Sequence, residues 1–171
     1  MLKSFKTITT FIFDVDGVLT DGSLLIMDNG EMLRKMHVKD GYALQLAVKK
    51  GFLIFIISGS NSPQVKERLA RLGVVNVYMQ VENKLEKLRI LSTEFNLQKE
   101  EILFMGDDIP DFEVMQYCGF ACCPADAVSE IKSISKYISP VKGGEGCVRD
   151  VIEKVMKVQG KWIADTNIPS T

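Results

Sequence analysis

Two aspartates separated by one valine follow an apolar run near the start of the chain. The segment TTFIFD ends at Asp14 and continues as VDGVLTDG, so that Asp14 and Asp16 stand at the end of a predicted buried strand. Two like charges there repel each other unless a cation lies between them. Asp14 could then attack phosphorus, and Asp16 could protonate the leaving oxygen and later activate water. Gly17 would allow the tight turn that brings both carboxylates round one phosphate.

Other polar residues follow predicted strands further along the chain. Ser58 ends the apolar run FLIFIIS, Gly59 follows it, and the segment GDDIPD follows the apolar run EILFM. Lys84 opens the helix predicted after the strand VVNVYM. Ligands of open parallel sheets bind beyond the carboxyl ends of the strands, so we expect these groups to meet at one edge. A hydroxyl, a lysine and free backbone N–H groups there are suited to binding phosphate.

The predicted edge offers oxygen ligands rather than nitrogen or sulfur. Its carboxylates are those of Asp14, Asp16, Asp107, Asp108 and Asp111. Oxygen ligands favour Mg²⁺, which usually binds one or two carboxylates together with a phosphate. We expect Asp107 to be a direct ligand, with Asp108 and Asp111 behind it and Asp111 a partner for Lys84. His37, the single histidine, is expected to have a structural or rim role rather than a catalytic one.

Apolar runs alternate with amphipathic segments along most of the chain, which is typical of βαβ units and a parallel sheet. The exception is a hairpin at about residues 23–38, where Asn29 and Gly30 favour a type I′ turn. Asp40 is expected to cap the helix that follows. We predict an α/β fold, a Rossmann-like three-layer sandwich with a mostly parallel five-stranded sheet.

The predicted domain covers residues 1–158, and residues 159–171 form a tail that lacks periodicity and is expected to fray.

Lys and Arg total 21 and Asp and Glu total 22, so the net charge of −1 gives no general attraction to nucleic acid or to membranes. No apolar run approaches the roughly 20 residues of a membrane span. The N-terminus does not have the pattern of a signal peptide, so the expected compartment is the cytoplasm. Four cysteines without a CxxC pair are expected to be reduced core thiols.

The polar segments also occur in the order of a known set of motifs. DVDGVLTDG resembles the first motif of haloacid dehalogenase-type phosphatases, and ISGS is similar to the second. Lys84 fits the third motif and GDDIPD the fourth. Each motif alone is weak, but four in order over about 100 residues are specific. The hairpin and the short connection before Lys84 leave no room for the cap domain that many relatives carry.

The resemblance can be narrowed to small capless members. DGVLTDG, KDGYAL, NKL and GGEGCVRD are similar to segments of 3-deoxy-D-manno-octulosonate 8-phosphate (KDO 8-phosphate) phosphatases and close sugar-acid phosphatases, over about residues 8–158. This narrower resemblance implies hydrolysis of a sugar acid phosphate through an aspartyl-phosphate intermediate. It also implies a homotetramer, in which the hairpins meet at the centre and a neighbouring subunit covers each active site.

The same resemblance implies a role for each matching residue. Mg²⁺ would be bound by Asp14, by the backbone carbonyl of Asp16 and by Asp107, and the phosphoryl group by Ser58, Gly59 and Lys84. Arg149, in the segment GGEGCVRD, would approach the substrate carboxylate or the adjacent site. Ser60 stands where the octulosonate enzymes usually have Arg and the nine-carbon sugar-acid enzymes have Glu, so this substrate-facing position leaves both sugars open.

Two alternative interpretations do not involve phosphatase activity. A phospho-accepting signalling domain of receiver type is also α/β and also uses Mg²⁺ and an aspartate. In that class, however, the phosphorylated aspartate ends a middle strand, whereas the second strand here ends in Ser58. A scaffold that has lost activity is disfavoured, because every residue type that the reaction requires is present.

Overall fold

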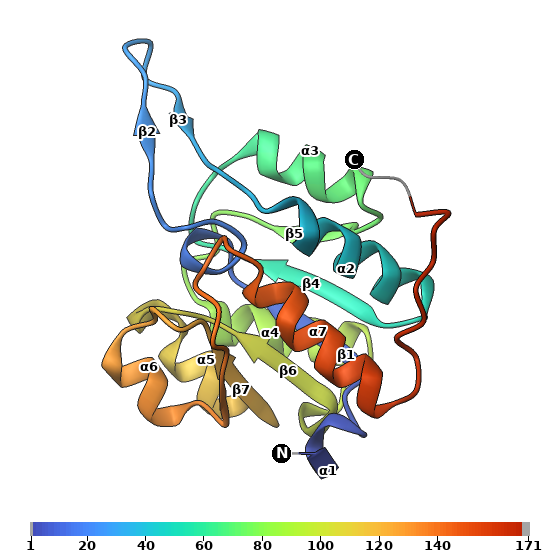
Figure 1. The fold of residues 1–171 in the computed structure, drawn as a ribbon. Coiled ribbons are helices and arrows are strands. Elements are labelled where there is room, and N and C mark those ends of the chain that lie inside the picture. The colour runs from blue at the N-terminus through green and yellow to red at the C-terminus, as the bar shows by residue number, and fades with distance from the viewer. Residues whose placement is uncertain (1, 169–171) are drawn as a thin grey trace.

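Six parallel strands form the central sheet of the protein, for which a computed structural model describes residues 2–168. Their order across the sheet is β5-β4-β1-β6-β7-β8 (Figure 1). The strands are β1 (Thr10–Phe13), β4 (Leu53–Ile57), β5 (Asn76–Tyr78), β6 (Ile102–Met105), β7 (Phe120–Cys123) and β8 (Tyr137–Ile138). The chain winds outward in both directions from β1, so the carboxyl ends of β1, β4 and β6 border the switch point where such folds bind ligands.

The predicted α/β class is confirmed, but the predicted number of five strands is wrong. The sixth strand, β8, pairs with β7, with Tyr137 opposite Cys122 and Ile138 opposite Cys123. Two residues are too few to show the alternation by which a strand is found in a sequence.

Helices cover both faces of the sheet and complete the three predicted layers (Figure 1). They are α1 (Leu2–Phe5), α2 (Val38–Lys49), α3 (Pro63–Arg71), α4 (Lys84–Glu94), α5 (Phe112–Tyr117), α6 (Ser129–Ile134) and α7 (Cys147–Val158). Phe11 and Phe13 of β1 pack in the core with α2, α3 and α7, whereas Ile12 packs with α4, α5 and α6. Because successive side chains of a strand point to opposite faces, β1 is anchored on both sides and its end is held firmly.

A hairpin of two short strands, β2 (Leu25–Ile26) and β3 (Met32–Leu33), projects from the body of the molecule (Figure 1). The Gly30 N–H donates to the Met27 carbonyl at 2.9 Å, and of the predicted turn residues only Gly30 has a positive φ. The predicted type I′ turn needs a positive φ at Asn29 too, so that prediction is wrong. Asn29 instead accepts the Glu31 N–H through its side chain. Between β1 and α2 lie only the helical turn Val15–Leu19 and the hairpin, and within residues 2–168 no cap domain is present.

The C-terminal segment that follows α7 packs along α2. Lys49 Nζ lies 2.6 Å from a carboxylate oxygen of Asp165, and the ring of Trp162 meets that of Tyr42 edge to face. The expected fraying is therefore wrong for residues 161–168, while the last part of the predicted tail, residues 169–171, lies outside the described residues. Within residues 2–168 no helix combines the length and the apolar character needed to cross a membrane.

Candidate active site

Nine of the predicted site residues line one cavity of about 700 Å³ at the carboxyl edge of the sheet. They are Asp14, Asp16, Ser58, Gly59, Ser60, Lys84, Asp107, Asp108 and Asp111. The cavity is also lined by Val81, a position where relatives differ, and by Gln80 and Glu82, which the sequence did not assign to the site. All three lie in the loop between β5 and α4, and no motif points to Gln80 or Glu82.

The nucleophile loop, residues 14–22, follows β1 directly. Asp14 is buried, and its N–H donates to the Met105 carbonyl at 3.1 Å, which continues the pairing of β1 with β6. Gly17 has a φ of 84°, and a Cβ at this position would overlap the Asp107 carboxylate. Glycine is therefore required here for two reasons, its backbone conformation and the close approach of Asp107.

Lys84 connects the nucleophile loop to the segment after β6. Its ammonium nitrogen lies 3.0 Å from Asp14 Oδ1 and 2.6 Å from Asp111 Oδ1. The Lys84 side chain is only 7% exposed and that of Asp111 only 1%. The other Asp111 oxygen accepts the Asp107 N–H at 3.1 Å. Asp111 therefore positions both Lys84 and Asp107, in agreement with the predicted partnership.

Three carboxylates form a group that fits a divalent metal. Oxygen atoms of Asp14, Asp107 and Asp111 lie within 4.8 Å of one another. Asp107 Oδ1 is buried without a hydrogen-bond partner among the described residues, whereas Asp14 Oδ1 is paired with Lys84. A buried polar oxygen is costly unless it is paired. The donor set and the unpaired Asp107 oxygen therefore fit Mg²⁺.

The electrostatics of these carboxylates also favour a bound cation. Burial, and secondly the charge of Asp111, raise the pKa of Asp14 to about 7 against the pull of Lys84. Burial, followed by the charges of Asp14, Asp111 and Asp108, raises the pKa of Asp107 to about 8. Burial alone would lower the pKa of Lys84, but Asp14 and Asp111 together raise it. The site thus holds more negative charge than one lysine offsets, and an added cation would relieve the excess.

The residues after β4 supply the groups expected to bind phosphate. Ser58 is buried, and its Oγ lies 3.0 Å from Ser60 Oγ and accepts the Ser60 N–H at 3.2 Å. The Ser58 N–H donates to the Tyr78 carbonyl, so the sheet holds the residue in place. Asp108 is exposed, and its Oδ1 accepts the Ile109 N–H at 2.8 Å, which caps the short helical turn of residues 109–111.

Asp16 is held by an arginine that the sequence did not single out. Arg34 Nε lies 2.7 Å from Asp16 Oδ1, and Arg34 Nη2 lies 3.1 Å from Asp16 Oδ2. Arg34 follows β3 at the base of the hairpin, 18 residues from Asp16. A lone arginine in a hairpin usually lies on the surface, so its type and position carry no signal of this contact.

Arg149 lies elsewhere in the protomer. Its side chain bonds to Glu153 at 3.2 Å and contacts the rings of Tyr42 and Trp162, and it is absent from the described lining of the cavity. Its role towards substrate stays a prediction. The Arg149 N–H, however, donates to Asp40 Oδ1 at 2.7 Å. Asp40 therefore caps α7, and the prediction that it caps its own helix is wrong.

The GGEG segment before α7 packs against the nucleophile loop. A Cβ on Gly143 would overlap the Gly17 carbonyl, and one on Gly144 would overlap the Asp21 N–H. The Gly144 N–H donates to the Val18 carbonyl at 3.0 Å. These glycines are explained by close contact of two backbones. His37, at the start of α2, lies beside Gly146, with Nδ1 buried and unpaired among the described residues.

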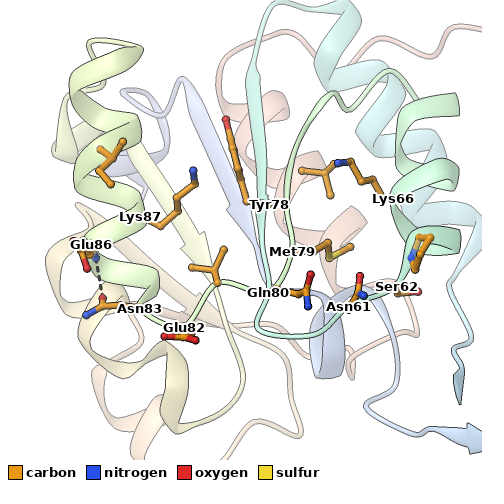
Figure 2. A pocket seen from close by; sticks show the side chains of 14 residues that line it. Asn61, Ser62, Lys66, Tyr78, Met79, Gln80, Glu82, Asn83, Glu86 and Lys87 are labelled. Atoms are coloured by element: carbon orange, nitrogen blue, oxygen red, sulfur yellow. Dashed lines mark hydrogen bonds between the residues drawn. The ribbon is translucent and has the colours of Figure 1, made fainter.

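A second hollow, of about 660 Å³, lies beside the active-site cavity between α3 and α4. Figure 2 shows Lys66 and Lys87 on its opposite walls and the loop with Gln80 and Glu82 along its lower edge. Lys87 Nζ lies 3.9 Å from the centre of the Tyr78 ring. Gln80, Val81 and Glu82 line both the second hollow and the active-site cavity, so the loop that contains them lies between the two.

The chain resembles known proteins along nearly its whole length. Residues 71–151 match the family of haloacid dehalogenase-like hydrolases. The chain is 35% identical to the 3-deoxy-D-manno-octulosonate 8-phosphate phosphatase of Salmonella typhi, over 94% of this chain and 86% of that protein. It is 34% identical to the same enzyme of Escherichia coli K12, with the same coverage.

Solved structures agree in fold and in sequence. The Moraxella catarrhalis 3-deoxy-D-manno-octulosonate 8-phosphate phosphatase, in complex with a magnesium ion, a phosphate ion and a KDO molecule, has a TM-score of 0.91 and 30% identity, covering 94% of this chain and 92% of that one. The cobalt-bound enzyme of Haemophilus influenzae has a TM-score of 0.88 and 29% identity, covering 92% of each chain.

Proposed function

Because this chain belongs to the haloacid dehalogenase-like hydrolases, in the family of the 3-deoxy-D-manno-octulosonate 8-phosphate phosphatases, we propose that it hydrolyses KDO 8-phosphate to KDO and inorganic phosphate. The observation that carries the proposal is the meeting of Asp14, Asp16, Ser58, Lys84 and Asp107 in one cavity at the sheet edge. In bacteria that make lipopolysaccharide, this reaction would supply the free sugar acid.

The reaction proceeds in two displacements. A carboxylate oxygen of Asp14 attacks phosphorus, the bond from phosphorus to the sugar oxygen breaks, and Asp16 gives its proton to that oxygen. Water then attacks the phosphoryl group on Asp14, and Asp16 takes a proton from the water. The bond between Asp14 and phosphorus breaks, which releases phosphate and restores both aspartates. Lys84, the Ser58 hydroxyl and the backbone N–H groups near Gly59 bind the phosphoryl oxygens throughout.

Magnesium is the proposed cofactor. Asp14, the carbonyl of Asp16 and Asp107 would hold it, with Asp111 fixing Asp107 and Lys84 from behind and Asp108 lying at the exposed rim. When bound, the ion would reduce the negative charge of Asp14 and of the phosphoryl oxygens, so that the two can approach. The unpaired Asp107 Oδ1 among the described residues supports this assignment.

The identity of the sugar rests on the relatives and on the residues at the mouth of the cavity. The relatives favour the eight-carbon acid, and neither the nine-carbon sugar-acid phosphate nor a non-enzymatic signalling domain is favoured by the comparisons. Ser60 lines the cavity and is the candidate to face the substrate. Arg149 would reach a substrate carboxylate only at an adjacent site, because its side chain points to Tyr42 and Trp162 in this protomer.

We further propose that the enzyme is a cytoplasmic homotetramer assembled through its hairpins. The hairpin exposes Leu25 (62%) and Ile26 (71%), together with Met32 and Leu33. An isolated two-stranded hairpin is marginally stable, and an exposed apolar patch is typical of an interface. The four buried free cysteines support a reducing compartment.

Phosphate release tests the proposal. The panel contains KDO 8-phosphate, a nine-carbon sugar-acid 9-phosphate and phosphoglycolate, each with Mg²⁺ and with a chelator. We expect the highest kcat/KM on KDO 8-phosphate and no turnover without metal. Asp14→Asn should abolish turnover while far-ultraviolet circular dichroism stays unchanged. A flat profile, or a maximum on phosphoglycolate, would overturn the substrate, and an active Asp14→Asn variant would overturn the nucleophile.

A further inference from the structure

Arg34 holds both carboxylate oxygens of Asp16 although it does not line the described active-site cavity. The Arg34 side chain is 5% exposed, whereas that of Asp16 is 32% exposed and faces the cavity. An exposed ion pair contributes little, but a buried guanidinium in a two-point contact fixes the geometry of a carboxylate. The contact is therefore built into the fold rather than made by chance between two surface side chains.

The other contacts of Asp16 and Arg34 are weak. Thr20 Oγ1 donates to Asp16 Oδ1 at 3.4 Å, and Arg34 Nη1 donates to the Met32 carbonyl at 3.4 Å. Both distances exceed the ordinary range for hydrogen bonds. Without Arg34, the long Thr20 contact would be the one hydrogen bond that residues 2–168 leave to the Asp16 side chain, so its orientation would be poorly fixed.

We propose that Arg34 is a positioning residue that fixes the carboxyl group of Asp16 beside the leaving oxygen. This inference rests on the proposed role of Asp16 as acid and base. A protonated Asp16 can keep one oxygen on the Arg34 fork and direct the O–H of the other to the sugar oxygen. The ionised form accepts both hydrogen bonds and stays aligned for the water. Arg34 thus acts through Asp16 and does not touch the substrate.

The test compares two leaving groups. KDO 8-phosphate releases a sugar alkoxide that needs a proton, whereas p-nitrophenyl phosphate releases a phenolate that leaves without one. The value of kcat/KM reports the steps up to release of the leaving group, so the later hydrolysis of phospho-Asp14 does not affect it. If KDO 8-phosphate is not turned over, the alkyl phosphate of the panel with the highest kcat/KM takes its place.

We expect Arg34→Met to lower kcat/KM on the alkyl phosphate by about 10–100-fold and on p-nitrophenyl phosphate by less than about 3-fold. Arg34→Lys should recover part of the loss, because the charge remains without the fork. Lys35→Met removes the next cation of the same segment, which is 74% exposed and pairs with Asp21, and should leave both substrates unaffected. Thermal unfolding of each variant checks that it is folded.

The Asp16→Asn variant separates the two proposals. The double variant Arg34→Met/Asp16→Asn should be no slower than Asp16→Asn on the alkyl phosphate, because the two residues act as one unit. Equal losses on both leaving groups, or additive losses in the double variant, would overturn the role of Arg34. If Asp16→Asn itself keeps its alkyl phosphatase activity, the assigned acid and base is wrong.

Discussion

Lys84 and Asp111 form a buried ion pair in which the ammonium nitrogen lies 2.6 Å from Asp111 Oδ1. The same nitrogen lies 3.0 Å from Asp14 Oδ1, so one lysine links the segments that follow β1 and β6. Both side chains line the cavity but are nearly inaccessible to solvent, and without Lys84 the carboxylates of Asp111 and Asp14 would be buried with no compensating charge from this lysine.

Lys84→Met should therefore destabilise the metal-free protein by about 3–5 kcal/mol, the usual cost of breaking a buried pair from one side. Urea unfolding measures the loss. Lys87→Met, on the same helix and only partly buried, is the control and should cost about 1 kcal/mol or less. A Lys84→Met variant as stable as the wild type would contradict the importance of the pair.

Asp107→Asn should remove the stabilisation of the protein by Mg²⁺. A ligand present at 100 times its dissociation constant stabilises the folded state by about 2.7 kcal/mol, which thermal unfolding detects readily. Asp108→Asn, one residue away but exposed, should keep most of the Mg²⁺ response. If the two variants lose the response equally, Asp107 is not the distinguishing ligand.

Asp40 should make the stability of the fold depend on pH. Burial, opposed by the Arg149 N–H and charge, raises the pKa of Asp40 to about 7. The folded state then binds a proton more tightly than the unfolded state, so this contribution to stability falls as pH rises from about 4 to about 7. Asp40→Asn keeps the acceptor for the Arg149 N–H without the charge, so its stability relative to wild type should increase over that range. Urea unfolding at several pH values measures the difference, and a constant difference would refute the assignment.

Gly143→Ala should lower activity by displacing the nucleophile loop, because a Cβ at this position would overlap the Gly17 carbonyl. We expect a fall in kcat of about 10-fold or more, since small displacements of catalytic groups have effects of this size. Gly30→Ala, in the hairpin turn, has open space around its Cβ but a positive φ, so it tests the effect of backbone strain far from the site without an overlap. Steady-state kinetics on the preferred phosphate should separate the two variants.

The sequence predicted which residues meet in the cavity where those residues follow strand ends. Asp14, Ser58 and Asp107 follow buried runs that parallel strands bring to one edge, so their meeting follows from the fold class. The sequence did not predict the contacts that depend on tertiary packing. Arg34 reaches Asp16 across a projecting hairpin, and Asp40 bonds to a helix 109 residues away. No local pattern encodes either partner.

The fold shows the same division. Phe11, Ile12 and Phe13 make β1 recognisable, because a run of aromatic and β-branched residues is a strong signal of a strand. Strand β8 has two residues, and the segment 161–168 is ordered by contacts with Tyr42 and Lys49 rather than by its own periodicity. Short elements, and segments held by contacts with distant residues, cannot be predicted without knowledge of the elements that pack against them.

The contact between the GGEG segment and the nucleophile loop also sets the order of events during synthesis. The loop leaves the ribosome early, yet the Val18 carbonyl receives its hydrogen bonds from the Gly144 N–H and the Cys147 Sγ, near the opposite end of the chain. Domains generally complete folding as units. A nascent chain, or one clipped before residue 143, therefore carries every catalytic side chain and still lacks the backbone that closes the loop around them.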